Sequence, residues 1–365
     1  MPSERPTSPA PGPSGPGPSG PASGQSSDLI LGIESSCDET AAAVVRGGRE
    51  ILSSIVETQI AEHAAFGGVV PEIAGRSHLR AILPVIDRAL DEAGVTLDDL
   101  TAVAVTAKPG LIGSLLVGLS AAKALAYSRG LPLVCVDHVE AHVFAATMEH
   151  DRSPYPCIAL VVSGGHTSLY RAASPLEITA LNRTIDDAAG EAFDKVAWIL
   201  GLDYPGGPSV SRLATEGDPQ AIAFPRCRVK GAQGIPPFSF SGLKTSVLYH
   251  VRGQNALAAT PAPEAIPDRP DVAASFQEAV VDSLVRPTIA TARELGLGTV
   301  LVVGGVACNA RLRERMTAAA EDAGLECRFP SPAYCTDNAA MIAGLGYHLL
   351  HAGQIAGLHA DASAR

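Results

Sequence analysis

Two histidines stand four residues apart, His138 and His142, in a mostly apolar segment. In a helix, side chains at positions i and i+4 lie one above the other on the same face. The spacing therefore predicts that both imidazoles reach a single cation, as they do in many zinc and iron sites. Two histidines supply at most half of a tetrahedral shell, so a further ligand must come from elsewhere in the chain. Ordinary histidines on a helix surface are the alternative.

The candidate third ligand is Asp337, which stands just before a predicted helical run at 339–350. An aspartate at such a junction is more often a helix N-cap, whose side chain accepts hydrogen bonds from the first free backbone N–H groups. The sequence leaves both roles open.

Glycine-rich turns follow two of the apolar segments. Ser163-Gly164-Gly165 follows residues 157–162, and a glycine pair at 304–305 precedes a predicted helix. Because glycine permits positive φ, successive backbone N–H groups in such a turn can face an anion. The turns predict phosphate cradles, with tight hairpins as the alternative. A dinucleotide fingerprint is excluded at these turns, where GxGxxG does not occur, and a P-loop is excluded because the chain contains no GxxxxGK[ST].

Three carboxylates, Asp187, Glu191 and Asp194, fall on a predicted helix at spacings that share one face. They could converge on a ligand there. The alternative is a solvated acidic face in which Glu191 pairs with Lys195 at i,i+4.

With 46% hydrophobic and 18% charged residues the folded part can bury a sizeable core, and the low aromatic content of 4% suits an α/β protein. The net charge of −11 argues against nonspecific affinity for nucleic acid or anionic membrane. One local block is basic instead, and it is either a phosphate-contacting surface or a solvated loop. The block contains Arg226, Arg228, Lys230, Lys244 and Arg252 and no acidic residue.

Seven cysteines are scattered without a CxxC pair, which is typical of a reduced, cytoplasmic protein. The chain shows no signal-peptide core and no uninterrupted apolar run of membrane-spanning length. We therefore expect a soluble cytoplasmic protein without membrane contact.

The chain divides into a tail and an ordered body. Residues 1–27 are almost wholly Pro, Gly, Ser and Ala and predict a disordered tail, because such a segment buries too little apolar surface to offset its ordering entropy. A Pro/Ala-rich stretch at about 253–270 predicts a surface loop. The apolar patterns predict strands at 29–33, 41–45, 157–162, 168–170 and 299–303, and helices at about 74–94, 112–130, 187–201, 271–295 and 310–323.

The strand, polar turn, strand pattern of residues 29–45 returns about 130 residues later at 157–170. This recurrence predicts two α/β lobes of related topology with a nucleotide in the cleft between them. That is the architecture of actin, sugar kinases and heat-shock ATPases. We assign residues 28–133 and about 338–355 to the first lobe and residues 134–337 to the second. Two unrelated hairpins are the alternative.

Eight motifs occur in the order, and at about the spacing, seen in one family. They are Glu34–Thr40, His138-xxx-His142, Val161–His166, Asp186–Lys195, Tyr204–Pro208, Phe238–Lys244, Gly304–Asn309 and Cys335–Asn338. Over about residues 28–350 the chain closely resembles the bacterial tRNA N6-adenosine threonylcarbamoyltransferases, relatives of the catalytic subunit of the KEOPS complex.

The resemblance implies an actin-like fold and transfer of threonylcarbamoyl from threonylcarbamoyl-adenylate to N6 of the adenosine 3′ of the anticodon. It makes His138, His142 and Asp337 the ligands of one divalent metal ion, iron(II) first and zinc second. It places Asp38 and Glu39 at the reacting centre. It assigns the adenylate to Val161, Val162, Ser163, Gly164, Gly165, Asp194, Gly207 and Asn309.

The resemblance also implies partners: tRNA, an inactive paralogue and a small ATPase. One departure is Asp137, because many relatives carry Asn at this position. Its carboxylate could hydrogen-bond a ligand histidine or cap the helix that begins there. Where the family's reaction needs a base for N6, either Asp38 or Glu39 is a candidate.

Three rival functions fit parts of this pattern. A metalloprotease needs Glu directly after the first histidine, where this chain has Val139, and Glu140 lies about 100° further round a helix. An ATPase or sugar kinase of the same fold does not explain the histidine pair. A non-catalytic scaffold does not explain retention of both histidines together with Asp337.

Overall fold

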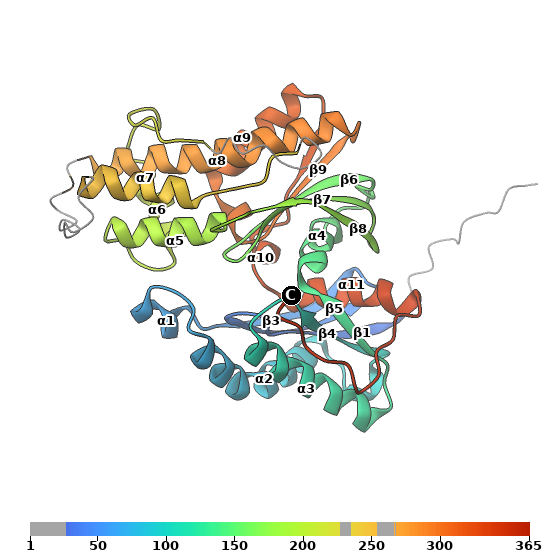
Figure 1. The fold of residues 1–365 in the computed structure, drawn as a ribbon. Helices are drawn as coiled ribbons and strands as arrows, with labels where there is room; N and C mark the ends of the chain where they lie inside the picture. Colours follow the sequence, from blue (N-terminus) through green and yellow to red (C-terminus); the bar gives the residue numbers. More distant parts are fainter. Residues whose placement is uncertain (1–26, 227–234, 254–265, 267) are drawn as a thin grey trace, which may run out of the picture.

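A computed structural model describes residues 27–226, 235–253, 266 and 268–365 (Figure 1). The predicted disordered tail lies outside the described residues apart from its last position. Most of the predicted Pro/Ala-rich loop lies outside them as well.

The first five-stranded sheet has the order β3-β2-β1-β4-β5. Its strands are β1 (Leu29–Glu34), β2 (Glu39–Arg46), β3 (Glu50–Thr58), β4 (Ala102–Lys108) and β5 (Leu133–Asp137). Strands β1, β2 and β3 run antiparallel, whereas β4 and β5 join parallel to β1. All of β1 is buried, in keeping with a strand that is covered on both faces.

The second sheet repeats this plan in the order β10-β9-β6-β7-β8. Its strands are β6 (Cys157–Val162), β7 (Thr167–Ser174), β8 (Glu177–Arg183), β9 (Thr299–Val303) and β10 (Glu326–Arg328). Again three antiparallel strands are followed by two parallel ones. The predicted recurrence of topology is confirmed, and two unrelated hairpins are excluded.

Helices cover both sheets (Figure 1). In the first lobe α2 (Pro71–Ala93) and α3 (Ile112–Arg129) pack together on one face, with the short α1 (Ile60–His63), η1 (Ala64–Phe66) and η2 (Leu97–Asp99) nearby. In the second lobe the principal helices are α5 (Ala189–Ile199), α6 (Gly206–Ala214), α7 (Ser241–Arg252), α8 (Arg269–Glu294) and α9 (Ala310–Asp322). The predicted helices are confirmed to within three residues at each end.

Helix α4 (His138–Met148) lies between the two sheets and is buried almost all round. Ala141 and Phe144 pack with α11 (Ala339–His351) against the first sheet. Val139 and Val143 pack against β6 and β9 of the second. A helix apolar on every face suits this position, and it fixes the first histidine at the junction of the lobes.

The remaining described elements, η5 (Gly305–Cys308) and α10 (Pro332–Cys335), contact each other beside this junction. Among the described residues, no helix is long and apolar enough to cross a membrane.

Candidate metal centre and substrate cleft

Helix α4 starts directly after β5, so this strand at the edge of the first sheet fixes the direction of the helix and of its two histidines. Asp137 is the N-cap, and its carboxylate accepts hydrogen bonds from the backbone N–H of Val139 (2.8 Å) and of Glu140 (3.1 Å). It also pairs with Lys108 Nζ at 3.4 Å. The cap role proposed for Asp137 is therefore confirmed, and it places no carboxylate oxygen against the ligand histidines.

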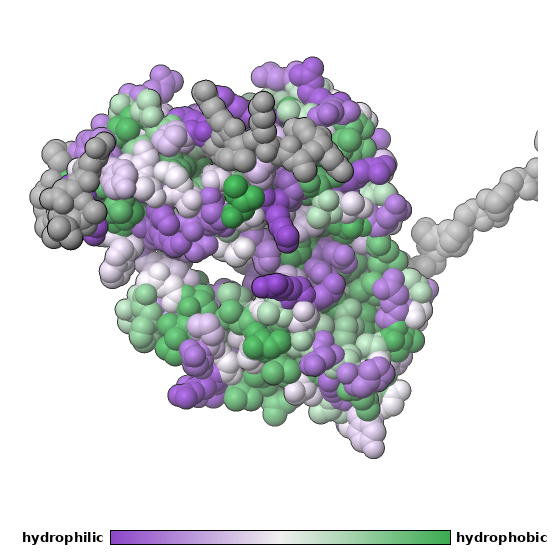
Figure 2. Space-filling view, in the orientation of Figure 1, coloured by the Kyte–Doolittle hydropathy of each residue, from purple (hydrophilic) through white to green (hydrophobic). Residues whose placement is uncertain are grey.

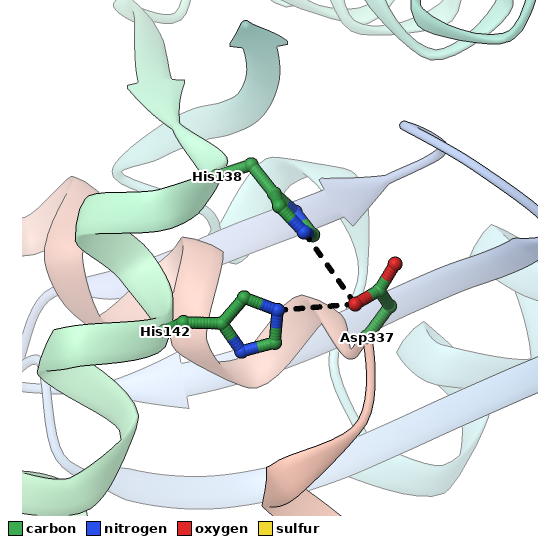
Figure 3. A group of neighbouring side chains, drawn as sticks. All are labelled: His138, His142 and Asp337. Carbon is green, nitrogen blue, oxygen red and sulfur yellow. Dashed lines mark hydrogen bonds and ion pairs between the residues drawn. The ribbon is translucent and has the colours of Figure 1, made fainter. Parts of the chain in front are cut away.

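The histidines and Asp337 converge (Figure 3). Asp337 Oδ1 lies 3.4 Å from His138 Nε2 and 3.1 Å from His142 Nε2. The cap of α11 is Asn338, whose side chain accepts from Met341 N at 3.0 Å. The alternative of an N-cap role for Asp337 is thus wrong, because the neighbouring amide fills it and leaves the carboxylate facing the imidazoles.

The donor set fits a metal ion. Ligand atoms of His138, His142 and Asp337 all lie within 4.8 Å of one another. The carboxylates of Asp337 and Glu34 hold the pKa of His138 well above its usual value, although burial by itself lowers it. Conversely, burial raises the pKa of Asp337, but His138 and His142 hold it well below its usual value. The group therefore stabilises positive charge, which a divalent cation supplies.

Glu34 is a site residue that sequence reasoning did not single out. It is fully buried at the end of β1, and its Oε2 accepts from His138 Nδ1 at 2.9 Å and from Thr106 Oγ1 at 2.6 Å. A proton on His138 Nδ1 leaves the Nε2 lone pair directed at the space beside Asp337. The sequence holds one hint of the role of Glu34, because a carboxylate at the end of a buried strand needs a hydrogen-bonding or charged partner. It does not say which residue that partner is.

Asp38 lies in the turn between β1 and β2, and Glu39 begins β2, with their carboxyl groups in hydrogen-bond contact. Burial, then the charges of Asp337 and Asp38, raise the pKa of Glu39 to about 10. His78 braces this turn, because its Nε2 donates to the Cys37 carbonyl at 2.9 Å. The predicted catalytic pair is thus fixed beside the metal group, with Glu39 within electrostatic reach of Asp337.

The β6–β7 turn faces the same region from the other lobe. The side chains of Val161 and Val162 are fully buried, so they offer a ligand only backbone atoms. Ser163 N donates to His166 O at 2.8 Å. A Cβ added at Gly164 or Gly165 would meet no atom within 4 Å.

Neither Gly164 nor Gly165 has a positive φ, so that reason for glycine in the turn was wrong. What their lack of a side chain provides is open space above the backbone. The ring of His166 lies 6.5 Å from that of His138. This histidine, which sequence reasoning also passed over, brings the turn close to the metal group.

Asp194 lies on α5 and accepts from Gly206 N at 2.7 Å. Burial raises its pKa to about 6, with a contribution from Asp38 across the cleft. A cleft of about 380 Å³ opens beside Asp194, with residues of both lobes on its walls, and the surface in Figure 2 is hollowed between the lobes. The lining residues are Ala64, Gly67, Asp194, Ala197, Trp198, Leu202, Asp203 and Tyr204.

Asn309 caps α9 by accepting from Leu312 N at 2.9 Å. Its amide group donates to Ser211 Oγ and Gln277 Oε1, each at 2.8 Å. Gly207, near the start of α6, has open space where a side chain would lie. The sequence did not identify Ser211 and Gln277 as partners of Asn309, because no local pattern connects residues on separate helices.

The three carboxylates predicted to converge do not. Asp187 precedes α5 and pairs with Lys195 (2.9 Å) and Lys244 (2.8 Å), whereas Asp194 turns to Gly206. The cause is that the helix begins at Ala189, two residues later than expected. The predicted Glu191–Lys195 pair is confirmed at 2.7 Å.

The predicted basic block is partly used within the protein. Lys244 pairs with Asp187, and Arg226 pairs with Asp282 at 3.1 Å. Arg228 and Lys230 lie outside the described residues. The block thus stays a prediction as a phosphate-contacting surface.

Solved structures share this two-lobed architecture. Full-length HypF, in a phosphate- and nucleotide-bound form, has a TM-score of 0.61 at 13% identity and covers 91% of this chain and 48% of that one. Component A of the (R)-2-hydroxyglutaryl-CoA dehydratase of Acidaminococcus fermentans has a TM-score of 0.50 at 16% identity, covering 88% and 98%. The predicted fold class is confirmed.

A family model described as tRNA N6-adenosine threonylcarbamoyltransferase matches residues 50–344. The proteins of that name from Symbiobacterium thermophilum and Geobacter metallireducens are 53% and 54% identical to this chain. The first alignment covers 90% of this chain and 94% of the relative, the second 92% and 95%. The chain belongs to the tRNA N6-adenosine threonylcarbamoyltransferase family.

Proposed function

We propose that this chain transfers the threonylcarbamoyl group from threonylcarbamoyl-adenylate to N6 of the adenosine 3′ of the anticodon, in tRNAs that read codons beginning with A. AMP is the leaving group. The observation that carries the proposal is the convergence of His138, His142 and Asp337 on one point at the junction of the lobes. Family membership supports the same reaction.

His138, His142 and Asp337 would hold one divalent metal ion. Two imidazoles and one carboxylate favour iron(II), the ion of many such sites with open positions, and zinc is the second candidate. When bound, the ion supplies Lewis-acid polarisation of a substrate oxygen. Glu34 and the cap at Asp137 hold the ligand helix in place for it.

The adenylate would lie across the β6–β7 turn. Backbone N–H groups of Gly164 and Gly165, above which there is open space, suit its phosphate, while Val161 and Val162 support this turn from strand β6. Asp194 and Gly207 border the space for the nucleoside. Asn309 is already engaged by Leu312, Ser211 and Gln277, so we assign it the role of holding the turn at the start of α9.

The reaction needs a proton acceptor, because an aromatic amine is a poor nucleophile. N6 attacks the carbonyl carbon of the mixed anhydride, the bond from that carbon to the phosphate oxygen breaks, and the N6 proton leaves. The raised pKa of Glu39 and its contact with Asp38 favour the Asp38 carboxylate as the base.

The test combines the chain, its partner proteins, unmodified tRNA and threonylcarbamoyl-adenylate, followed by nucleoside analysis. We expect threonylcarbamoyladenosine, and we expect its yield to fall with a chelator and in the His142→Ala variant. A tRNA with guanosine at the target position is the control. Absence of the modified nucleoside would contradict the reaction, whereas chelator-insensitive product would contradict the metal.

We further propose a cytoplasmic assembly with an inactive paralogue and a small ATPase. An exposed apolar strip on the adjacent helices α2 and α3 supports contact with the paralogue, since Leu79 and Leu83 are 68% and 61% exposed and Ile112 and Leu116 are 48% and 44% exposed. Leu83→Arg should weaken this pairing without changing the melting temperature. If the variant still co-elutes with the paralogue on a gel-filtration column, this strip is not the contact surface. The lobe boundaries given above stay part of this proposal.

A further inference from the structure

Two thiols meet beside the site without a role in the proposed reaction. Cys308 ends η5 and is exposed, whereas Cys335 ends α10 and is buried. The two side chains lie in hydrogen-bond contact. Both sulfur atoms also lie near the backbone at the start of α10. Cys308 Sγ lies 3.9 Å from the Pro332 carbonyl, and Cys335 Sγ lies 3.5 Å from the Pro330 carbonyl.

Arg313 holds the two segments together. Its Nε donates to the Ala307 carbonyl at 2.7 Å, one residue before Cys308. Its Nη2 donates to the Pro330 carbonyl at 2.8 Å and lies 3.3 Å from Cys335 Sγ. The half-buried Arg313 guanidinium thus joins η5 to the loop before α10 and holds the two cysteine-bearing segments together.

The chemistry of the pair is asymmetric. The hydrogen bond from Cys335 lowers the pKa of the Cys308 thiol to about 7, with help from Arg313 and against the effect of burial. An exposed thiol that is partly ionised at neutral pH is the form that attacks a disulfide or peroxide. The hydrogen bond with Cys308, and then burial, raise the pKa of the Cys335 thiol, so Cys308 is the attacking thiol and Cys335 is the second member of the pair.

We propose that Cys308 and Cys335 form a reversible disulfide that ties η5 to α10 under oxidising conditions. With oxidised glutathione, the Cys308 thiolate attacks one sulfur and expels a glutathione thiolate. The Cys335 sulfur then attacks Cys308 and expels the second glutathione. Two protein thiols lose two electrons, one oxidised glutathione becomes two reduced molecules, and the two protein protons end on these.

The bond acts on the site because each cysteine is joined to a site residue. Cys308 precedes Asn309, the cap of α9, and Cys335 lies two residues before Asp337. A disulfide draws its sulfurs to about 2.05 Å, closer than a thiol contact, so η5 and α10 must approach. This movement would shift Asn309 on the nucleotide side of the site and Asp337 on the metal side. We therefore expect activity to be lost on oxidation.

The experiment equilibrates the purified chain with glutathione at increasing oxidised-to-reduced ratios, blocks free thiols and maps tryptic peptides by mass spectrometry. The two cysteines fall in separate peptides, residues 294–311 and 329–365, each with no other cysteine. We expect these peptides to be joined, and to separate after dithiothreitol. Finding them unjoined at every ratio overturns the proposal.

Two variants test the disulfide proposal further. Cys308→Ser, a change at an exposed position, should abolish the link, whereas Cys135→Ser on β5 should leave it unchanged. In the tRNA assay, which rests on the proposed function, oxidised wild type should lose most of its activity and regain it with dithiothreitol, while Cys308→Ser stays active throughout. Full activity of the disulfide-linked protein overturns the effect on the site, and the peptide map is readable whatever reaction the enzyme performs.

Discussion

The two lobes present the same hairpin to the cleft but equip it in opposite ways. The β1–β2 hairpin carries the acidic side chains Glu34, Asp38 and Glu39, and Glu39 lies within electrostatic reach of the other two and of Asp337. The β6–β7 turn has buried valines before it and two glycines at its tip. One topology thus offers side-chain carboxylates on one side and bare backbone on the other.

The difference shows how a duplicated plan divides a reaction. Backbone N–H groups suit a phosphate, which gains from several donors and repels carboxylates. Carboxylates can instead bind a cation, hydrogen-bond its ligand histidines and accept a proton during the reaction. Changes to the first turn should therefore alter metal binding or rate, and changes to the second should alter nucleotide affinity.

The largest effect is expected for Asp38→Asn, which removes the proposed proton acceptor and keeps its shape. The rate of transfer should fall by roughly a hundredfold or more, in the range of general-base catalysis. Adenylate affinity should not change, since the other hairpin holds the phosphate. Single-turnover kinetics and equilibrium binding separate the two quantities, and near-wild-type turnover would remove Asp38 from this role.

Glu34→Gln comes next, because it takes the charge from the partner of His138 Nδ1. Affinity for zinc or cobalt should fall by about 10- to 100-fold, as for other changes behind a ligand histidine. Thr106→Val, which removes only one hydrogen bond to the same carboxylate, is the matched control with a smaller effect. Metal titration of both variants, with melting curves to verify folding, tests this, and unchanged affinity in Glu34→Gln contradicts it.

Metal affinity should also depend on pH through His138. Its pKa lies well above the usual value because of Asp337 and Glu34, so a proton competes with the metal below that pKa. One displaced proton gives an affinity that rises about tenfold per pH unit as pH increases, and then levels off once His138 is neutral. Titrations at several pH values in a non-chelating buffer would show a flat dependence if no protonated imidazole is displaced.

The smallest effect is expected at the second turn. Gly164→Ala adds a methyl group to open space, so stability should hold while adenylate affinity falls by roughly tenfold through loss of room for the phosphate. Gly190→Ala is the contrast, because its Cβ would approach Ser163 O to 2.7 Å and should destabilise the protein by about 1–3 kcal/mol. If Gly164→Ala binds the adenylate as wild type does, the phosphate lies elsewhere.

Local patterns predicted the hairpins, the principal helices and the histidine pair, because apolar periodicity and i,i+4 spacing are properties of short segments. The N-cap of α11 was harder, since Asp337 and Asn338 are adjacent and both suit a cap. Glu34 and Gln277 could not be assigned because their partners, His138 and Asn309, come from distant elements. The predicted convergence of Asp187 with Asp194 failed through a two-residue error in the start of α5.

The histidine pair and Asp337 are expected to hold one metal ion at the junction of the lobes. Anomalous diffraction from crystals soaked in iron(II) or zinc tests it most directly. We predict one strong peak about 2.0–2.2 Å from Nε2 of His138, Nε2 of His142 and a carboxylate oxygen of Asp337. A saturating soak that places the metal elsewhere, or leaves these three atoms without it, would contradict the account.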